Sequence, residues 1–145
     1  MHSRILENIG GRRKFVVVLA PGEEAIATIQ DFASEHRIGA ASITGIGAFS
    51  GSKLGFFNPA TKVYKENVLE MQTEVLSLLG NVSMEGEGNY HLHIHVVLGC
   101  DDASTRGGHL VSAWVNPTLE LIIEESPGHL NRGKDEATGL VLLQP

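Results

Sequence analysis

The sequence has little cysteine and no long hydrophobic run. Its single cysteine, Cys100, cannot form a disulfide within the chain, and nothing else in the sequence indicates an oxidising compartment. No apolar stretch approaches the roughly 20 residues of a membrane-spanning helix, and residues 1–13 are mixed and polar, unlike a signal peptide. We therefore expect a cytoplasmic protein that makes no contact with a membrane.

Basic residues are also scarce. The 145 residues include 11 Lys and Arg against 17 Asp and Glu, which gives a formal net charge of −6. Binding to DNA phosphates draws its affinity from concentrated positive charge. The one basic cluster, Arg12-Arg13-Lys14, is typical of a solvated strand edge, with a phosphate contact as the less favoured alternative. We expect any association with DNA to be weak or indirect.

The chain is long enough to bury a hydrophobic core, and it shows no repeat, linker or low-complexity tract. Residues 1–145 are therefore expected to form a single domain. Residues 15–19 read as a buried strand closed by Pro21-Gly22. A helix should follow, with Glu23 and Glu24 in its first turn and Gly39 at its end.

After the helix the hydrophobic period becomes that of strands. Extended segments are expected at 41–44, 53–57, 62–66, 75–79, 90–98, 109–115, 118–124 and 140–143. Residues 45–51 contain three glycines, but their spacing departs from that of a dinucleotide-binding loop, so we expect a tight turn there. The predicted fold class is α/β of the α+β kind: a largely antiparallel sheet of about seven or eight strands with one main helix.

Histidines alternate with apolar residues in the segment 90–98. Successive side chains of a strand point to opposite faces, so Leu92, Ile94, Val96 and Leu98 should face the core, and His91, His93 and His95 the other side. A turn over 101–104 would place His95 opposite His109 on the next strand. The same register would pair Val97 with Gly107, His93 with Val111 and His91 with Ala113.

Convergence of His93, His95 and His109 would suit a divalent metal ion, zinc above others. Neutral histidine nitrogens bind zinc, and a site of three histidines leaves a fourth position for water or substrate. The alternative is a set of imidazoles that hydrogen-bond to backbone or carboxylates across a subunit contact. Glu74 and Glu120 are candidates for orienting a ring or moving a proton, although a solvated strand face is the more ordinary interpretation. Cys100 reads as a small packed residue, and His36 and His129 as surface residues.

Five motifs in order give the sequence a family resemblance. They are residues 44–49, Thr-Gly-Ile-Gly-Ala-Phe; 74–80, Glu-Val-Leu-Ser-Leu-Leu-Gly; 93–95, His-Ile-His; 107–110, Gly-Gly-His-Leu; and 118–121, Thr-Leu-Glu-Leu. From about residue 15 to residue 124 the chain resembles the plants-and-prokaryotes conserved (PPC) domain. The resemblance implies a largely antiparallel α/β domain assembled as a homotrimer. It also implies a link to DNA, because the domain follows AT-hooks in plant nuclear proteins and prokaryotic single-domain members are commonly named DNA-binding proteins.

The sequence departs from the plant pattern at the DNA-contacting segment. An AT-hook requires a Gly-Arg-Pro core, whereas Gly11-Arg12-Arg13 is followed by Lys14. The family's paired histidines and Gly-Gly-His motif map onto His93, His95 and His109, and His91 lies outside them as an expected outer group. Two hypotheses remain: a non-catalytic homotrimeric module that binds a metal or small-molecule ligand and acts on DNA through partners, which we prefer, and a zinc-dependent enzyme acting on a small molecule.

Overall fold

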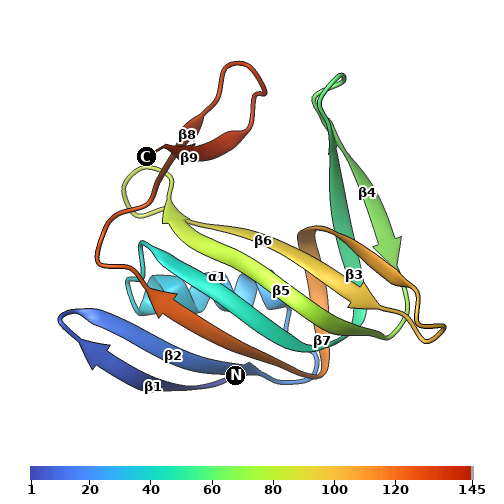
Figure 1. Ribbon diagram of the computed structural model, residues 1–145, viewed down its shortest axis with the longest axis horizontal. Coiled ribbons are helices and arrows are strands. Elements are labelled where there is room, and N and C mark those ends of the chain that lie inside the picture. The colour runs from blue at the N-terminus through green and yellow to red at the C-terminus, as the bar shows by residue number, and fades with distance from the viewer. Residues whose placement is uncertain (145) are drawn as a thin grey trace.

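The computed structural model describes residues 1–144, which form nine strands and one helix (Figure 1). The elements are β1 (His2–Ile9), β2 (Arg12–Leu19), α1 (Ala25–Glu35), β3 (Ala41–Asn58), β4 (Val63–Leu69), β5 (Thr73–Met84), β6 (Tyr90–Gly99), β7 (Thr105–Glu125), β8 (Asn131–Lys134) and β9 (Val141–Gln144). The mainly β architecture with one helix confirms the outline of the predicted fold. Among these residues no helix is both long and apolar enough to span a membrane.

All nine strands belong to one sheet with the order β1-β2-β7-β3-β5-β8-β9. Strand β4 pairs with β3, and β6 pairs with both β5 and β7, so β3, β5, β6 and β7 close into a ring of paired strands. The pairings are antiparallel except for the short contact between β5 and β8, which is parallel. This mixed sheet matches the expectation of a largely antiparallel one.

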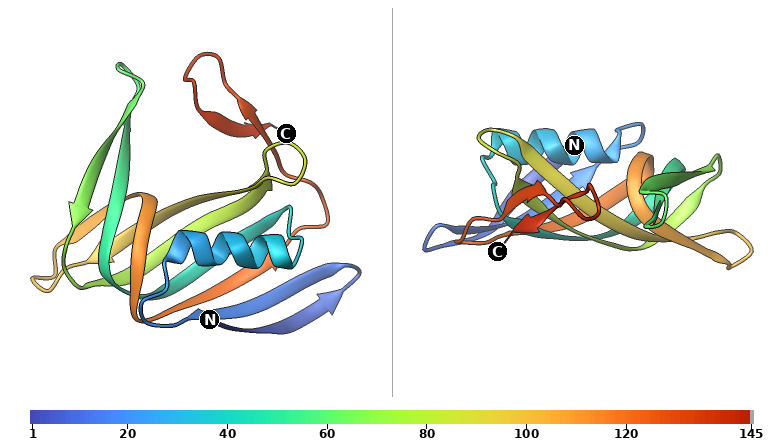
Figure 2. Two further views of the ribbon diagram at one scale, coloured as in Figure 1. Left: turned by 180° about the vertical axis from the view of Figure 1, so that it is seen from behind. Right: turned by 90° about the horizontal axis from the view of Figure 1, so that it is seen from above.

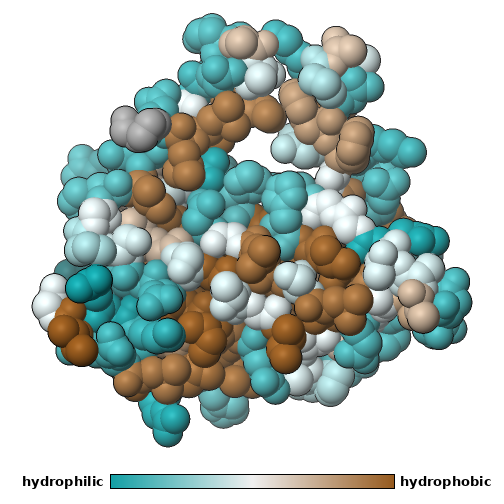
Figure 3. Space-filling model, in the orientation of Figure 1, coloured by the Kyte–Doolittle hydropathy of each residue, from teal (hydrophilic) through white to brown (hydrophobic). Residues whose placement is uncertain are grey.

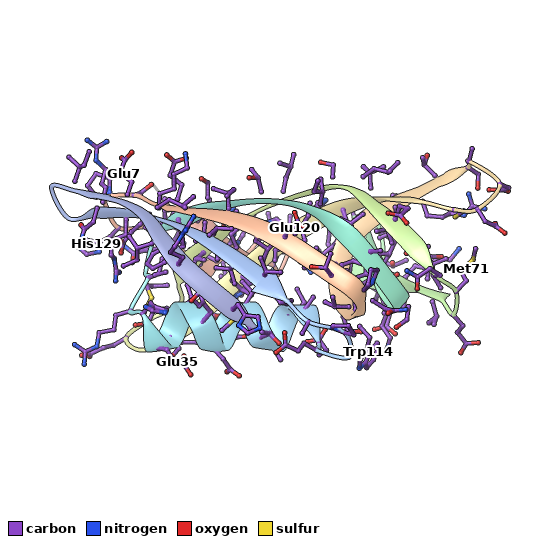
Figure 4. All side chains as sticks on the ribbon, turned by 90° about the horizontal axis from the view of Figure 1, so that it is seen from below. Glu7, Glu35, Met71, Trp114, Glu120 and His129 are labelled. Atoms are coloured by element: carbon purple, nitrogen blue, oxygen red, sulfur yellow. The ribbon has the colours of Figure 1, made fainter. Side chains whose placement is uncertain are left out.

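The helix α1 lies across one face of the sheet (Figure 2). Its side chains Ala25, Ile29, Phe32 and Ala33 are buried, and Phe32 meets Phe15 of β2 edge to face, with ring centroids 5.3 Å apart. Seen along the sheet, side chains fill the layer between α1 and the strands (Figure 4). The hydrophobic core therefore sits on the helix side of the sheet.

The start of α1 differs from the prediction. Glu23 and Glu24 both precede the helix, which begins at Ala25. Glu24 is the N-cap, and its carboxylate accepts hydrogen bonds from the backbone N–H groups of Ala27 at 2.7 Å and of Ala113 in β7 at 2.8 Å. The helix ends before Gly39, because Arg37 already takes the left-handed conformation that closes it. Glu24 thus ties the helix start to the sheet.

The turn predicted at residues 45–51 is wrong, because those residues lie within the long strand β3. Gly45 and Gly47 instead allow the backbone of β7 to approach β3 closely. A Cβ atom on Gly47 would overlap the carbonyl oxygen of Thr118 and come within 2.7 Å of the Cα atom of Leu119 in β7. The segments 109–115 and 118–124 likewise form one strand, β7, which runs through the cis peptide bond between Asn116 and Pro117.

The sheet face away from α1 exposes apolar side chains (Figure 3). We call this the open face and define it by Ile46, Leu76, Leu79 and Val97, whose exposed fractions are 60%, 54%, 58% and 43%. Leu79 lies opposite His95, so the histidine side of β6 adjoins the open face. Large apolar side chains gathered on one surface usually mark a surface that another molecule covers.

Two hairpins, the outer part of β3–β4 and the pair β8–β9, project from the same side of the sheet (Figure 1). The sequence did not predict β1 or β8. Every residue of β1 is exposed and β8 has four residues, so neither carries an alternating pattern long enough to be recognised. The β8–β9 hairpin matters most for the site, because it brings the end of the chain next to β5 and β6.

Candidate metal centre

The side chains of β6 alternate between the core and the opposite face of the sheet, as predicted. Ile94, Val96 and Leu98 are buried in the core, and Leu92 packs partly against it. Because neighbouring residues of a strand point to opposite faces, His93 and His95 must then lie away from the core. Burial of the apolar set therefore fixes the direction of the histidines.

The turn between β6 and β7 sets His109 against His95. The backbone N–H of Cys100 donates to the carbonyl of Ser104 at 2.9 Å, and Ala103 adopts a φ of 61° in this turn. The resulting ladder pairs His95 with His109 and Val97 with Gly107, which confirms the predicted register.

The same ladder is shorter than predicted. It ends at the His95–His109 pair, so within the described chain the expected pairings of His93 with Val111 and of His91 with Ala113 are wrong. The reason is that β7 turns away from β6 and continues along β3, where Leu110 pairs with Leu54. The two strands thus stay paired only as far as the histidines.

The three imidazoles converge even though the ladder ends there. The Nε2 atoms of His93 and His95 lie 3.1 Å apart, and the ring centroids of His109 lie 5.3 Å from His93 and 5.6 Å from His95. One ligating nitrogen from each ring lies within 4.8 Å of the other two. Among the histidine, cysteine, aspartate and glutamate side chains of residues 1–144, these three histidines form the one group that could hold a metal ion.

The donor set fits a zinc ion. Nitrogen ligands at about 2.0 to 2.1 Å from tetrahedral zinc lie roughly 3.3 Å from each other. The separation of 3.1 Å between His93 and His95 is close to that value, and a ring nitrogen of His109 lies within 4.8 Å of both. The Nδ1 atom of His109 is buried and has no hydrogen-bond partner among the described residues. If the three rings were held only by hydrogen bonds, this buried nitrogen would be expected to have a partner.

Burial favours the neutral form of His93 and of His109. The pKa of His93 is lowered to about 4, chiefly by burial, with smaller contributions from the positive charge of Arg132 and from the neighbouring rings. Burial also lowers the pKa of His109, with the same neighbours contributing. Neutral imidazole is the form that binds a metal ion, so at pH 7 both groups are in the ligating state.

Arg132 was not predicted, and it lies beside the histidines. It comes from β8, and with Tyr64, His91, His93 and His109 it lines a hollow of about 350 Å³. A single arginine 23 positions after His109 leaves no motif in the sequence. His91, expected as an outer group, lines the same hollow, and its Nδ1 atom lies 3.6 Å from a carboxylate oxygen of Glu85.

The glutamate candidates lie elsewhere in the chain. Glu74 and Glu120 are both exposed and line a shallow hollow together with Ile46 and Leu76 at the open face. Glu74 pairs with Gly99, at the end of β6 remote from His93. The structure thus brings the two glutamates to each other and not to the hollow beside the histidines.

The other residues considered in the sequence analysis, Cys100, His36 and His129, lie outside the histidine trio. Cys100 is half-buried at the β6–β7 turn. His129 is exposed, as predicted, but the surface placement of His36 is wrong: its ring packs on Phe32, with centroids 4.3 Å apart, and on Phe15. The prediction failed because the core reaches past the last turn of α1.

Comparison with known proteins identifies the family. Residues 7–127 match the family described as the Plants and Prokaryotes Conserved (PCC) domain, also abbreviated PPC. The chain belongs to this family. The resemblance carried by the five sequence motifs is therefore confirmed. No curated protein matches the chain.

Solved structures share its fold. A protein of Bacteroides thetaiotaomicron named for DNA binding is 32% identical, with 98% of this chain and 96% of that one covered and a TM-score of 0.89. A metal-containing protein of Archaeoglobus fulgidus is 37% identical, covering 91% and 93%, at a TM-score of 0.85. A plant- and prokaryote-conserved protein of Pyrococcus horikoshii is 30% identical, covering 99% and 95%, also at 0.85.

The lowered histidine pKa values predict that the metal-free protein loses stability in mild acid. In the unfolded chain a histidine takes up its proton near pH 6.5. Folded His93 resists protonation until about pH 4, so stability is complete above 6.5 and falls as the pH drops from 6.5 toward 4. Because His93 is only partly buried and is screened by solvent, we expect it to contribute a loss of about 1 kcal/mol between about pH 7.5 and about pH 5.

Urea unfolding in the presence of a chelator measures this loss. The variant His93→Gln, which carries no proton-binding imidazole, should show a smaller pH dependence than the wild type. Carboxylates with lowered pKa values, such as Glu125 beside Arg13, act at more acidic pH and leave this window unaffected. Equal pH dependence in the two proteins would contradict the assigned environment of His93.

Proposed function

We propose that this PPC-domain protein is a homotrimeric module that binds one divalent metal ion per chain, preferably zinc, through His93, His95 and His109. The observation that carries the proposal is the convergence of three ligating nitrogens within 4.8 Å on two paired strands. With its single cysteine, the module is suited to the reducing cytoplasm. The related protein of Archaeoglobus fulgidus, 37% identical, is described as metal-containing, which supports the assignment.

The homotrimer is supported by the open face. Ile46, Leu76, Leu79 and Val97 are each more than two fifths exposed in the isolated chain, and such a surface is costly to leave in water. Burial against further copies of the same chain would remove that cost, and the family resemblance implies three copies. The metal centres would then lie near the subunit contacts, because Leu79 is paired with His95.

Elemental analysis of the purified protein after dialysis tests the metal assignment. We expect about one zinc ion per chain, because three preorganised imidazoles hold zinc against dialysis. A protein that contains no metal, and that takes up none when zinc is added, would contradict the proposal. The trio would then be a set of packed, hydrogen-bonded rings.

We propose that contact with DNA is weak or indirect. The chain carries a net charge of −6, and in its basic cluster Arg13 is already paired with Glu125 at 2.7 Å. In fluorescence anisotropy with an AT-rich duplex at physiological salt, we expect dissociation constants weaker than about 10 μM, in the range of non-specific binding. The naming of relatives for DNA binding would be explained by partners. Nanomolar, sequence-selective binding by the isolated protein would overturn this expectation.

A second candidate function is a zinc-dependent enzyme acting on a small molecule. The observation in its favour is the hollow of about 350 Å³ beside the trio, where a metal-activated water could meet a substrate. Such an enzyme also needs an acid or base near the metal. Glu74 and Glu120, the candidates for that role, do not line this hollow, and so we place the binding module first.

A further inference from the structure

The hollow beside the trio has one wall of histidines and another wall that is apolar. His91, His93 and His109 come from β6 and β7, and the residues 139–142 approach from the β8–β9 hairpin. Leu140, Val141 and Leu142 supply aliphatic groups, and Tyr64 of β4 supplies an aromatic ring. A volume of about 350 Å³ is at the lower end of the range for small-molecule sites.

Arg132 is the charged group of this hollow. Only 7% of its surface is exposed. Its guanidinium donates to the hydroxyl of Ser83 at 2.6 Å, to the side-chain carbonyl of Asn81 at 3.0 Å and to the backbone carbonyl of Val141 at 2.9 Å. All three acceptors are neutral, and the guanidinium has further N–H donors to offer. Within residues 1–144 Arg132 forms no ion pair.

A metal ion at the trio would leave this region with a strong positive charge. The ligands are neutral histidines, and the described residues that line the hollow include no acid. Glu85 lies farther out, against His91. Arg132 lines the same hollow as His93 and His109, so its charge lies close to the proposed metal ligands. Buried positive charges without a counter-ion are unfavourable, so the metal-loaded hollow favours an anion.

We propose that the hollow binds a small organic carboxylate, with the carboxylate group between the metal ion and Arg132 and the hydrocarbon part against Leu140 and Leu142. This inference rests on the proposed metal centre and names the ligand class of that centre. Arginine pairs with planar carboxylates through parallel hydrogen bonds, and a divalent metal ion accepts a carboxylate oxygen. The apolar wall favours a carboxylate that carries a short hydrocarbon chain over inorganic phosphate, which has none.

Cobalt(II) in place of zinc gives a test, because its visible spectrum reports a change of ligands. Adding propionate to the cobalt-loaded protein should shift the spectrum in a saturable way, whereas propionamide, neutral and of equal size, should not. The variant Arg132→Met should weaken propionate binding about tenfold, the value of one charge-assisted hydrogen bond, while cobalt affinity does not fall. Asn81→Ala removes an acceptor of Arg132 but keeps its charge, so it should retain propionate binding.

The outcomes separate this inference from the metal centre itself. If cobalt binds but propionate leaves the wild-type spectrum unchanged, or if Arg132→Met binds propionate as tightly as the wild type, the carboxylate site is wrong and the metal centre stands. Equal loss of propionate binding in Asn81→Ala would show that Arg132 acts only by holding the hairpin. Tighter binding of inorganic phosphate than of propionate would overturn the ligand class. Failure of cobalt to bind would overturn the metal centre.

Discussion

Replacing His95 by alanine is expected to lower the zinc affinity by about 100-fold or more. Structural zinc sites bind with roughly 10 to 16 kcal/mol from about four ligands, so one ligand accounts for about 3 kcal/mol, or about 100-fold in affinity. His95 is exposed, so its truncation removes a ligand without opening a cavity in the core. Calorimetric titration of zinc into metal-free wild type and His95→Ala measures the difference.

The matched control is His129→Ala. His129 is also exposed and lies between β7 and β8, outside the trio, so its replacement should leave zinc affinity unchanged. His36→Ala, which should also bind zinc normally, is the poorer control because its ring packs on Phe32 and Phe15 and its loss would disturb the core. Equal zinc affinity in wild type and His95→Ala would refute the three-histidine site.

Introducing a charge on the open face is expected to dissociate the homotrimer. In light scattering at micromolar concentration, the wild type should have three times the mass of one chain, and Leu76→Glu should have the mass of one chain. Leu76 is 54% exposed and lies in the patch that we propose to be covered. A carboxylate buried at such a contact would cost several kcal/mol per subunit, enough to shift the equilibrium to the monomer.

A surface control separates this effect from a general loss of solubility. Ile9 is 62% exposed at the end of the outer strand β1 and lines a different hollow, with Arg12 and Glu124, so Ile9→Glu should remain trimeric. Circular dichroism checks that Leu76→Glu keeps its fold. A monomeric wild type would end the proposal of a homotrimer, and a trimeric Leu76→Glu would move the contact to another surface.

The convergence of the three histidines was predictable because it depends on local features of the sequence. The alternation of His93, Ile94 and His95 decides the side of the strand, since a residue buried in the core forces its neighbours outward. The turn at 101–104 is short and polar, so it decides the partner of His95 within a few residues. Local periodicity and a tight turn are properties that the sequence carries on its own.

The failures lie where contacts join distant segments. Residues 45–51 have the composition of a turn, but their glycines lie within β3 because the backbone of β7 passes too close for a side chain at Gly47. Likewise, β7 leaves β6 after His109 to follow β3, which removed the pairing expected for His93 and Val111. Neither outcome leaves a mark on nearby sequence, because the competing strand lies far away in the chain.

The sequence by itself determined the class of the fold, the family and the three histidines that face one another. The tertiary structure decided what surrounds them: Arg132 reaches the trio only because β8 pairs with β5, some 50 residues earlier, and the sheet keeps an apolar face that no part of residues 1–144 covers. The physical reason is the distance along the sequence over which each kind of interaction acts. Side-chain period and turn chemistry act over a few residues, whereas the approach of Arg132 depends on how the whole sheet closes.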